Sequence, residues 1–189
     1  MRAVIVAAII AATGASVSAN EFAPAMQTYL DTEIRGWSDN PLLVEAIKSQ
    51  NAKTAGYAEA TILELDSQWR SEVGSGSSEL VNGVLDSEAS TYLRDVIERS
   101  QGSVTEIFLM DSVGLNVAAS GATSDYWQGD EAKHAETYAK GPDAVHFGDV
   151  EFDESSQTFQ VQISFPVIDP ANNEPVGAIT VGLNAEALY

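Results

Sequence analysis

The hydrophobic spacing of the chain changes once, near Gly102, and this change constrains the fold more than any other feature. Before it, apolar side chains recur every three or four residues, which is the period of a helix buried on one side. After it, apolar and polar residues tend to alternate, which is the period of a strand with one buried face. Helices followed by strands predict an α+β domain in which the helices cover a sheet.

Two helical stretches are expected at the start of the half that precedes Gly102. Residues 21–37 carry one apolar stripe. Asn40 and Pro41 then suit a helix start, because asparagine caps the first turn and the missing N–H of proline has no helical partner there. The second stretch is expected to continue to about Arg70, with a weak point at Gly56. The sequence does not decide whether these two stretches form one long kinked helix or two consecutive helices.

A third helical stretch follows a linker. Residues 74–78 contain only glycine and serine, which is typical of a flexible connector. They lack the lysine and the helix-opening pattern of a phosphate-binding loop. Residues 79–99 regain the helical period, with an expected break near Asp86, and Gly102 suits the position just after a helix.

Five strands of an antiparallel sheet are expected in the second half, with a hairpin turn at residues 111–114 and a short helix over residues 130–139. The expected strands cover residues 104–110, 113–120, 145–152, 158–167 and 176–183. In the last two, one face is apolar and can receive a helix. The other face is smaller and more polar, and its Gln162, Ser164 and Thr180 are candidate ligand-binding residues.

The charge and composition exclude several functions. The formal net charge is −19, from 28 acidic and 9 basic residues. Binding to nucleic acid requires the opposite sign, and docking on anionic lipid is disfavoured for the same reason. There is no cysteine, so disulfides and thiolate metal sites are excluded. With 189 residues, of which 44% are hydrophobic, the chain is long enough for one domain with a core.

The first nineteen residues read as a secretory signal peptide. Arg2 supplies the positive charge, residues 3–12 form a short apolar run, and residues 17–19 are small at the expected cleavage site. A buried N-terminal helix is the less favoured alternative. The apolar run is too short to cross a bilayer of about 30 Å. We therefore expect a single domain over residues 20–189, exported to the periplasm or secreted, without a direct membrane anchor.

An aromatic loop at residues 123–130 is the main candidate for a binding site. Tyr126 and Trp127 stand beside a turn glycine, between the predicted strands. One ring is expected to stack on a ligand while its polar tip donates a hydrogen bond. The alternative is that both rings only seal the loop onto the sheet.

Asp130 and Lys133 follow this loop and are candidate ligand-binding residues. Together they are able to hold the two ends of a zwitterion, because a carboxylate ligand needs a cationic donor. An ordinary surface pair on a helix explains the same spacing and is worth only a few tenths of a kcal/mol.

Acidic residues and histidines give no convincing metal or catalytic site. Asp149, Glu151 and Asp153 alternate and are expected to share one strand face, but a calcium-loop pattern with its central glycine is missing. His134 and His146 lack further ligands at zinc spacing. No catalytic serine motif is present. We therefore predict no metal, no cofactor and no enzymatic activity.

Several motifs, taken together and in order, resemble the periplasmic Cache-type sensor domains, which are extracytoplasmic relatives of the PAS fold. The motifs are Asn40-Pro41, Ala46-Ile47, Gln50-Asn51, Leu65-Asp66, Trp69, Thr105–Phe108, Asp111, Gly114, Thr123–Glu131, Asp153–Ser155, Pro166–Asp169 and Gly177–Ile179. The resemblance implies long N-terminal helices packed on one face of a five-stranded antiparallel sheet. It also implies a pocket for small carboxylates or amino acids on the other face, with Asp153 near it.

Three functional hypotheses follow. The first is a sensor module that binds a small metabolite and acts through a partner such as a membrane sensor or receptor protein, because the chain stops at Tyr189 without a second membrane helix. The second is a structural or interaction subunit with a filled pocket, dimerising through its N-terminal helix. The third and weakest is an exported hydrolase that depends on His146 or Asp153.

Overall fold

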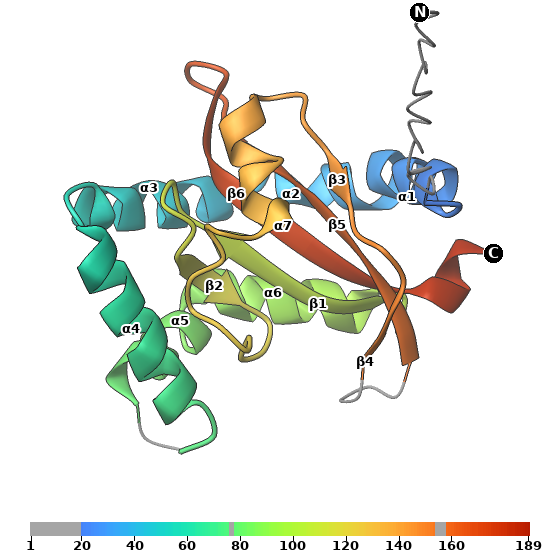
Figure 1. The fold of residues 1–189 in the computed structure, drawn as a ribbon. Helices are drawn as coiled ribbons and strands as arrows, with labels where there is room; N and C mark the ends of the chain where they lie inside the picture. Colours follow the sequence, from blue (N-terminus) through green and yellow to red (C-terminus); the bar gives the residue numbers. More distant parts are fainter. Residues whose placement is uncertain (1–19, 76–77, 154–157) are drawn as a thin grey trace, which may run out of the picture.

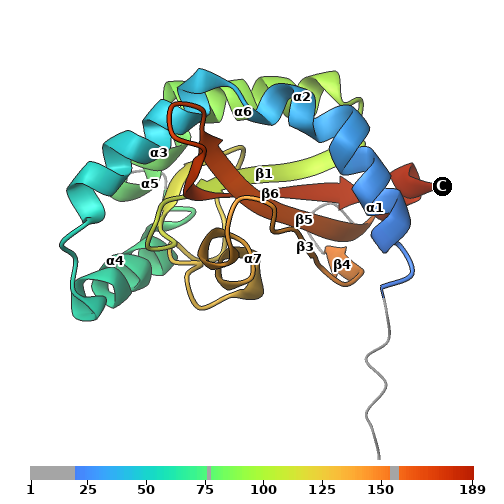
Figure 2. The ribbon, with the colours of Figure 1, turned by 90° about the horizontal axis from the view of Figure 1, so that it is seen from above.

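Helices cover one face of a twisted antiparallel sheet in the computed structural model of the chain (Figures 1 and 2). The structure describes residues 20–75, 78–153 and 158–189, without the side chain of residue 153. The predicted signal peptide, residues 1–19, lies outside the described residues, as does part of the predicted linker. Within the described residues, none of the helices combines the length and apolar content needed to span a bilayer.

The helices lie mostly before the sheet in the sequence. They are α1 (Ala23–Tyr29), α2 (Arg35–Ser38), α3 (Pro41–Thr54), α4 (Glu59–Glu72), α5 (Glu79–Leu85), α6 (Glu88–Arg99) and α7 (Ala132–Ala135). A π-helical segment, η1 (Leu30–Ile34), joins α1 to α2 and makes the predicted first helix nearly continuous. Short 3-10 helices, η2 (Tyr138–Lys140) and η3 (Ala185–Leu188), lie after α7 and after the last strand.

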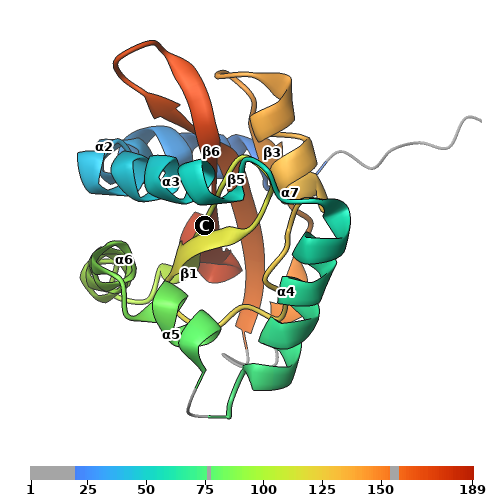
Figure 3. The same ribbon diagram turned by 90° about the vertical axis from the view of Figure 1, so that its left-hand side faces the viewer.

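The second predicted helix is wrong in its length, because residues 55–58 interrupt it. The N–H of Tyr57 bonds to the carbonyl of Thr54 in a turn, and Ala58 is extended with φ −75° and ψ 153°. Gly56 lies in this turn, where the sequence has its weak point. As a result α4 turns away from α3 and descends beside the end of the sheet (Figure 3).

The short helix predicted over residues 130–139 is wrong in its bounds, because α7 covers only Ala132–Ala135 and is followed by the separate 3-10 helix η2. The boundaries predicted near Asn40, Asp86 and Gly102 are confirmed. The N–H of Leu42 donates to the side chain of Asn40 at 3.0 Å, so α2 and α3 are separate helices with a capped start between them. Ser87 caps α6 in the same way, which places the expected break between α5 and α6. Gly102 follows α6 with a φ of 93°, a conformation that glycine adopts without strain.

The described strands form an antiparallel sheet of the predicted kind. They are β1 (Val104–Met110), β2 (Asn116–Ala119), β3 (His146–Phe147), β4 (Glu151–Asp153), β5 (Thr158–Asp169) and β6 (Glu174–Asn184). The order across the sheet is β2-β1-β6-β5-β3, and β4 also pairs with β5. The two long strands β5 and β6 therefore occupy the centre.

The strand predicted over residues 145–152 is wrong, because two short strands replace it. His146 pairs with Ser164, whereas Glu151 pairs with Gln160, so the register shifts by one residue between β3 and β4. The extra residue acts as a bulge and moves the following side chains to the opposite face. Asp149 lies between the two short strands, so Asp149, Glu151 and Asp153 do not belong to one strand as expected.

The main core lies between the helices and the predicted apolar face. Ile163 on β5 and Val181 on β6 are fully buried there, together with Leu43 of α3 and Leu93 of α6. Burying each such side chain stabilises the fold by roughly 1.5–3 kcal/mol. Phe159 is the exception, because it lies near the start of β5 and is 58% exposed.

A smaller core closes one end of the opposite face. Trp69 of α4 and Tyr126 pack there against Phe108 and Met110 of β1. The rest of this face, over β5 and the first half of β1, carries polar side chains. These polar residues form the candidate site.

Candidate functional site

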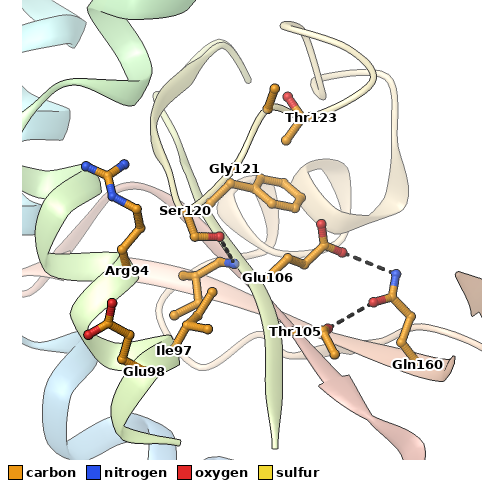
Figure 4. Close-up of a pocket in the computed structure, with 12 residues that line it drawn as sticks. Arg94, Ile97, Glu98, Thr105, Glu106, Ser120, Gly121, Thr123 and Gln160 are labelled. Atoms are coloured by element: carbon orange, nitrogen blue, oxygen red, sulfur yellow. Dashed lines mark hydrogen bonds between the residues drawn. The ribbon is translucent and has the colours of Figure 1, made fainter. Parts of the chain in front are cut away.

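A carboxylate and two amides meet on the polar face of the sheet, and Figure 4 shows Glu106 with one of the amides, Gln160. The Nε2 group of Gln162 donates to Glu106 at 2.7 Å, and that of Gln160 donates to the same oxygen at 3.4 Å. Thr105 donates its hydroxyl to the Oε1 atom of Gln160 at 2.9 Å. Residues from β1 and β5 thus form one hydrogen-bonded network, although β6 runs between the two strands.

Gly182 explains how these side chains meet across β6. It is the residue of β6 that pairs with Glu106 on one side and with Gln162 on the other. A Cβ atom at this position would lie 2.6 Å from Cγ of Glu106 and 2.8 Å from the hydroxyl of Thr105. The missing side chain therefore leaves the space in which the network forms.

Glu106 forms no ion pair with a cationic side chain among the described residues. Its side chain is half-buried, and the groups that bond to it are neutral amides. Hydrogen bonds from amides fix the position of the carboxylate but do not neutralise it. A ligand ammonium would add both a counter-charge and a charge-assisted hydrogen bond.

One cavity, of about 460 Å³, lies between α6 and the first half of β1. Arg94 and Glu98 of α6 line it, together with Glu106 and Gln160 (Figure 4). The guanidinium of Arg94 is held by hydrogen bonds to the carbonyl of Leu85 at 2.8 Å and to the hydroxyl of Thr91 at 3.0 Å. The volume is within the range of small-molecule sites.

A second cavity, of about 360 Å³, lies beside α7 on the same face. Lys133, Gln160 and Gln162 line it, so Gln160 borders both cavities. The Nζ atom of Lys133 is 2.9 Å from Glu131 and 5.5 Å from the ring centre of Phe108, which restrains the ammonium beside the sheet. Cationic, anionic and amide groups thus lie around one polar surface.

The structure brings together only some of the predicted ligand-binding residues. Lys133 and Gln162 line the same cavity. Asp130 is exposed, and Lys133 pairs with Glu131 instead. Ser164 and Thr180 are fully buried and bond to each other at 2.9 Å, so they lie beneath the surface of the cavity wall.

The two rings of the predicted aromatic loop are held by α4 and by the β1–β2 turn. The N–H groups of Tyr126 and Trp127 both donate to the buried carboxylate of Asp66, at 2.9 and 3.0 Å. Tyr126 stacks on Trp69 with ring centres 5.3 Å apart. The indole of Trp127 donates to the carbonyl of Val113 at 2.9 Å. Neither ring borders the two cavities described above.

The acidic residues considered for calcium lie at the edge of the sheet. Asp149 and Glu151 border the cavity beside α7. The backbone of Asp153 pairs with Thr158, while its side chain is outside the described part of the chain. In that described part, no three histidine or acidic side chains gather as a metal site would require.

His134 is a packed residue of α7. Its Nε2 atom lies 3.1 Å from the carbonyl of Asp111, and its ring stacks on Tyr138 at 5.3 Å. Burial lowers the pKa of His134, which favours the neutral ring with its Nε2–H donating to the carbonyl. His146, in contrast, borders the cavity beside α7.

Three residues of the site were not predicted from the sequence as ligand-binding residues: Glu106, Gln160 and Arg94. Glu106 had a signal, because it is a charged residue inside the apolar strand 104–110. Gln160 alternates with the apolar residues in the same way as Gln162. Arg94 had no sequence signal except that it is one of the nine basic residues of the chain.

Comparison with solved structures returns sensor and ligand-binding domains. The sensor domain of the V. cholerae histidine kinase DctB is 19% identical to this chain with a TM-score of 0.38, and the match covers 86% of this chain and 58% of that domain's chain. The sensory domain of the Campylobacter jejuni chemoreceptor Tlp3 with isoleucine bound is 11% identical with a TM-score of 0.40. This match covers 88% of this chain and 64% of the Tlp3 chain. The ligand-binding domain of the Pseudomonas aeruginosa amino acid chemoreceptor PctC in complex with GABA is 16% identical with a TM-score of 0.38. This match covers 69% of this chain and 62% of the PctC chain.

The chain spans less than two thirds of the length of each of these three structures. No protein-family model matches the sequence, and the curated proteins contain no similar one. The sequence motifs listed above resemble those of Cache-type sensor domains. The chain itself has the α+β arrangement which that resemblance implies, with helices on one face of an antiparallel sheet.

Proposed function

We propose that the chain is a sensor module that binds a small carboxylate or amino-acid-like metabolite and has no catalytic role. In this proposal residues 1–19 direct export to the periplasm or medium, and residues 20–189 form a single domain. The module acts through a partner, such as a membrane sensor or receptor protein. The ligands of the similar sensor domains named above, isoleucine and GABA, are of the proposed chemical class.

The observation that carries the proposal is the polar surface shared by the two cavities. It combines the uncompensated carboxylate of Glu106 with the ammonium of Lys133 and the amides of Gln160 and Gln162. These groups match the ammonium and carboxylate of a zwitterion. The hydrogen bonds that hold them restrict their motion before the ligand arrives, which lowers the entropic cost of binding.

A thermal-shift screen of amino acids and organic acids, followed by titration calorimetry, tests the proposal. Lys133→Gln is expected to weaken the best ligand roughly tenfold or more, because one charge-assisted hydrogen bond is lost. Lys140→Gln is the matched control, since Lys140 makes only an exposed pair with Glu136. Absence of any binding compound, or equal affinity in both variants, would contradict the proposal.

A structural or interaction subunit is the second candidate. The hydrogen bond between the buried hydroxyls of Ser164 and Thr180 favours it. These two side chains bond to each other and fill the centre of the polar face, as a filled pocket requires. In this case the N-terminal helix would pair with a second copy. A stable dimer that dissociates on Thr32→Arg, at an exposed position of η1, would favour this candidate if no ligand binds the sheet.

A further inference from the structure

A third cavity lies away from the sheet face, among the helices at the other end of the molecule. It has a volume of about 420 Å³ and is bordered by residues of α3, α4 and α5. These three helices surround the end of the sheet near the β1–β2 turn (Figure 3). The cavity shares no lining residue with the two cavities of the candidate site. We refer to it as the helical groove.

The hydroxyl of Tyr126 is available at the helical groove. The side chain is 94% buried and lines the groove, yet its hydroxyl makes no hydrogen bond to any residue in the described part of the chain. Burial raises the pKa of Tyr126 to about 12, so the hydroxyl remains a donor at neutral pH. The ring is buried, whereas the hydroxyl is not among the fully buried polar atoms without a partner in the described chain, so it is open to an acceptor in the groove.

Lys53 supplies a cation at the same groove. It lies in the last turn of α3 and, unlike Lys48 and Lys133, forms no ion pair with a described carboxylate. The chain has 28 acidic residues, and most of its described cationic side chains form an ion pair with one of them. Tyr57, three residues after the last residue of α3, adds a second phenol that is 40% exposed.

The remaining wall of the groove has an apolar part, and Gln50, Thr54 and Gln68 add neutral polar groups to it. Leu65 of α4 and Leu80 and Val84 of α5 line it. Glu79 also lines it and disfavours a ligand with two negative charges. A site with an apolar patch, one ammonium outside any ion pair and one accessible phenol suits a monoanion with an apolar body.

We propose that the helical groove is a second binding site, which takes a small monocarboxylate with an apolar body. The carboxylate accepts hydrogen bonds from the Tyr126 hydroxyl and the Lys53 ammonium, and the body packs on Leu65, Leu80 and Val84. This site is independent of the proposed sensor site. It also gives Tyr126 the hydrogen-bonding role predicted from the sequence, at a different place from the sheet face.

Titration calorimetry with phenylacetate tests this site, with neutral phenylacetamide as the matched probe. Phenylacetate is expected to bind saturably and phenylacetamide at least roughly tenfold more weakly, because only the carboxylate is charged. Tyr126→Phe and Lys53→Gln should each weaken phenylacetate roughly tenfold. Tyr126→Phe keeps the ring that stacks on Trp69, so its melting temperature should match that of the wild type.

The control variants are Tyr138→Phe and Lys140→Gln, which change the same residue types outside the groove. Lys133→Gln separates the two sites, because it should leave phenylacetate binding unchanged. Binding that survives Tyr126→Phe and Lys53→Gln, or falls with Lys133→Gln, would overturn the helical-groove site. Absence of saturable binding would overturn it as well, and none of these results would affect the sensor proposal.

Discussion

The two faces of the sheet differ in how completely the chain covers them. On the helix-covered face, β5 and β6 contribute Ile163 and Val181, which are fully buried under α-helices. On the other face, Trp69 and Tyr126 close only one end. The remainder carries the polar network of Glu106. The helix-covered face therefore stabilises the fold by burying apolar side chains, whereas the other face keeps polar groups and cavities and buries less apolar surface.

Neighbouring residues of β5 make this difference measurable. Ile163→Ala should lower the free energy of unfolding by about 2–5 kcal/mol, because it opens a cavity in the main core. Gln162→Ala, one residue away on the other face, should cost only about 1 kcal/mol, chiefly by removing a hydrogen bond to Glu106. Denaturant unfolding compares the two. Equal losses would mean that the polar face is as tightly integrated as the core.

Gly182 offers a sharper test of the polar network. Gly182→Ala should destabilise the protein by about 1–3 kcal/mol, since its Cβ would meet Glu106 and Thr105 at distances that require them to move. Adding Glu106→Ala should recover part of the loss by removing one of the two obstacles. Gly83→Ala is the control, because no atom lies within 4 Å of the added Cβ there. A double variant no more stable than Gly182→Ala would contradict the assigned role of Gly182.

The smallest expected effect is the pH dependence from His134. Its folded-state pKa lies below the ordinary value of 6.5, so the unfolded chain binds more protons as pH falls through this range. The stabilisation from the neutral ring is therefore complete above pH 6.5 and is lost as pH decreases toward the folded pKa. His134→Asn should flatten the stability curve below pH 6.5, as measured by thermal unfolding. An unchanged curve would show that His134 is not the group responsible.

The sequence predicts the helices and the central strands well where a regular period decides them. Met26, Leu30 and Ile34 share the expected stripe, and Val161 and Ile163 the expected face. The errors at residues 55–58 and 148–150 have another origin. The turn after Thr54 is a local interruption that a hydrophobic period does not report, and the one-residue bulge opposite β5 depends on tertiary pairing.

The candidate site is less predictable than the fold, for a related reason. Lys133 and Gln162 are found from local pattern, and they border one cavity. Glu106 and Gln162 meet only because β1 and β5 both flank Gly182, which requires the strand order. Tyr126 stands beside Trp127 in the sequence, yet stacks on Trp69 of α4 and borders the helical groove. Spatial neighbours across a sheet or a helix layer leave no short-range signal.

The most direct test of the central claim is an NMR titration that follows the side-chain amides of Gln160 and Gln162. These groups donate to Glu106 and line the proposed sensor site. The account predicts that the tightest ligand from the amino-acid and organic-acid screen shifts both signals saturably, and that Glu106→Gln or Lys133→Gln weakens the effect. Signals that stay unchanged with every compound of the screen would contradict a ligand site on this face.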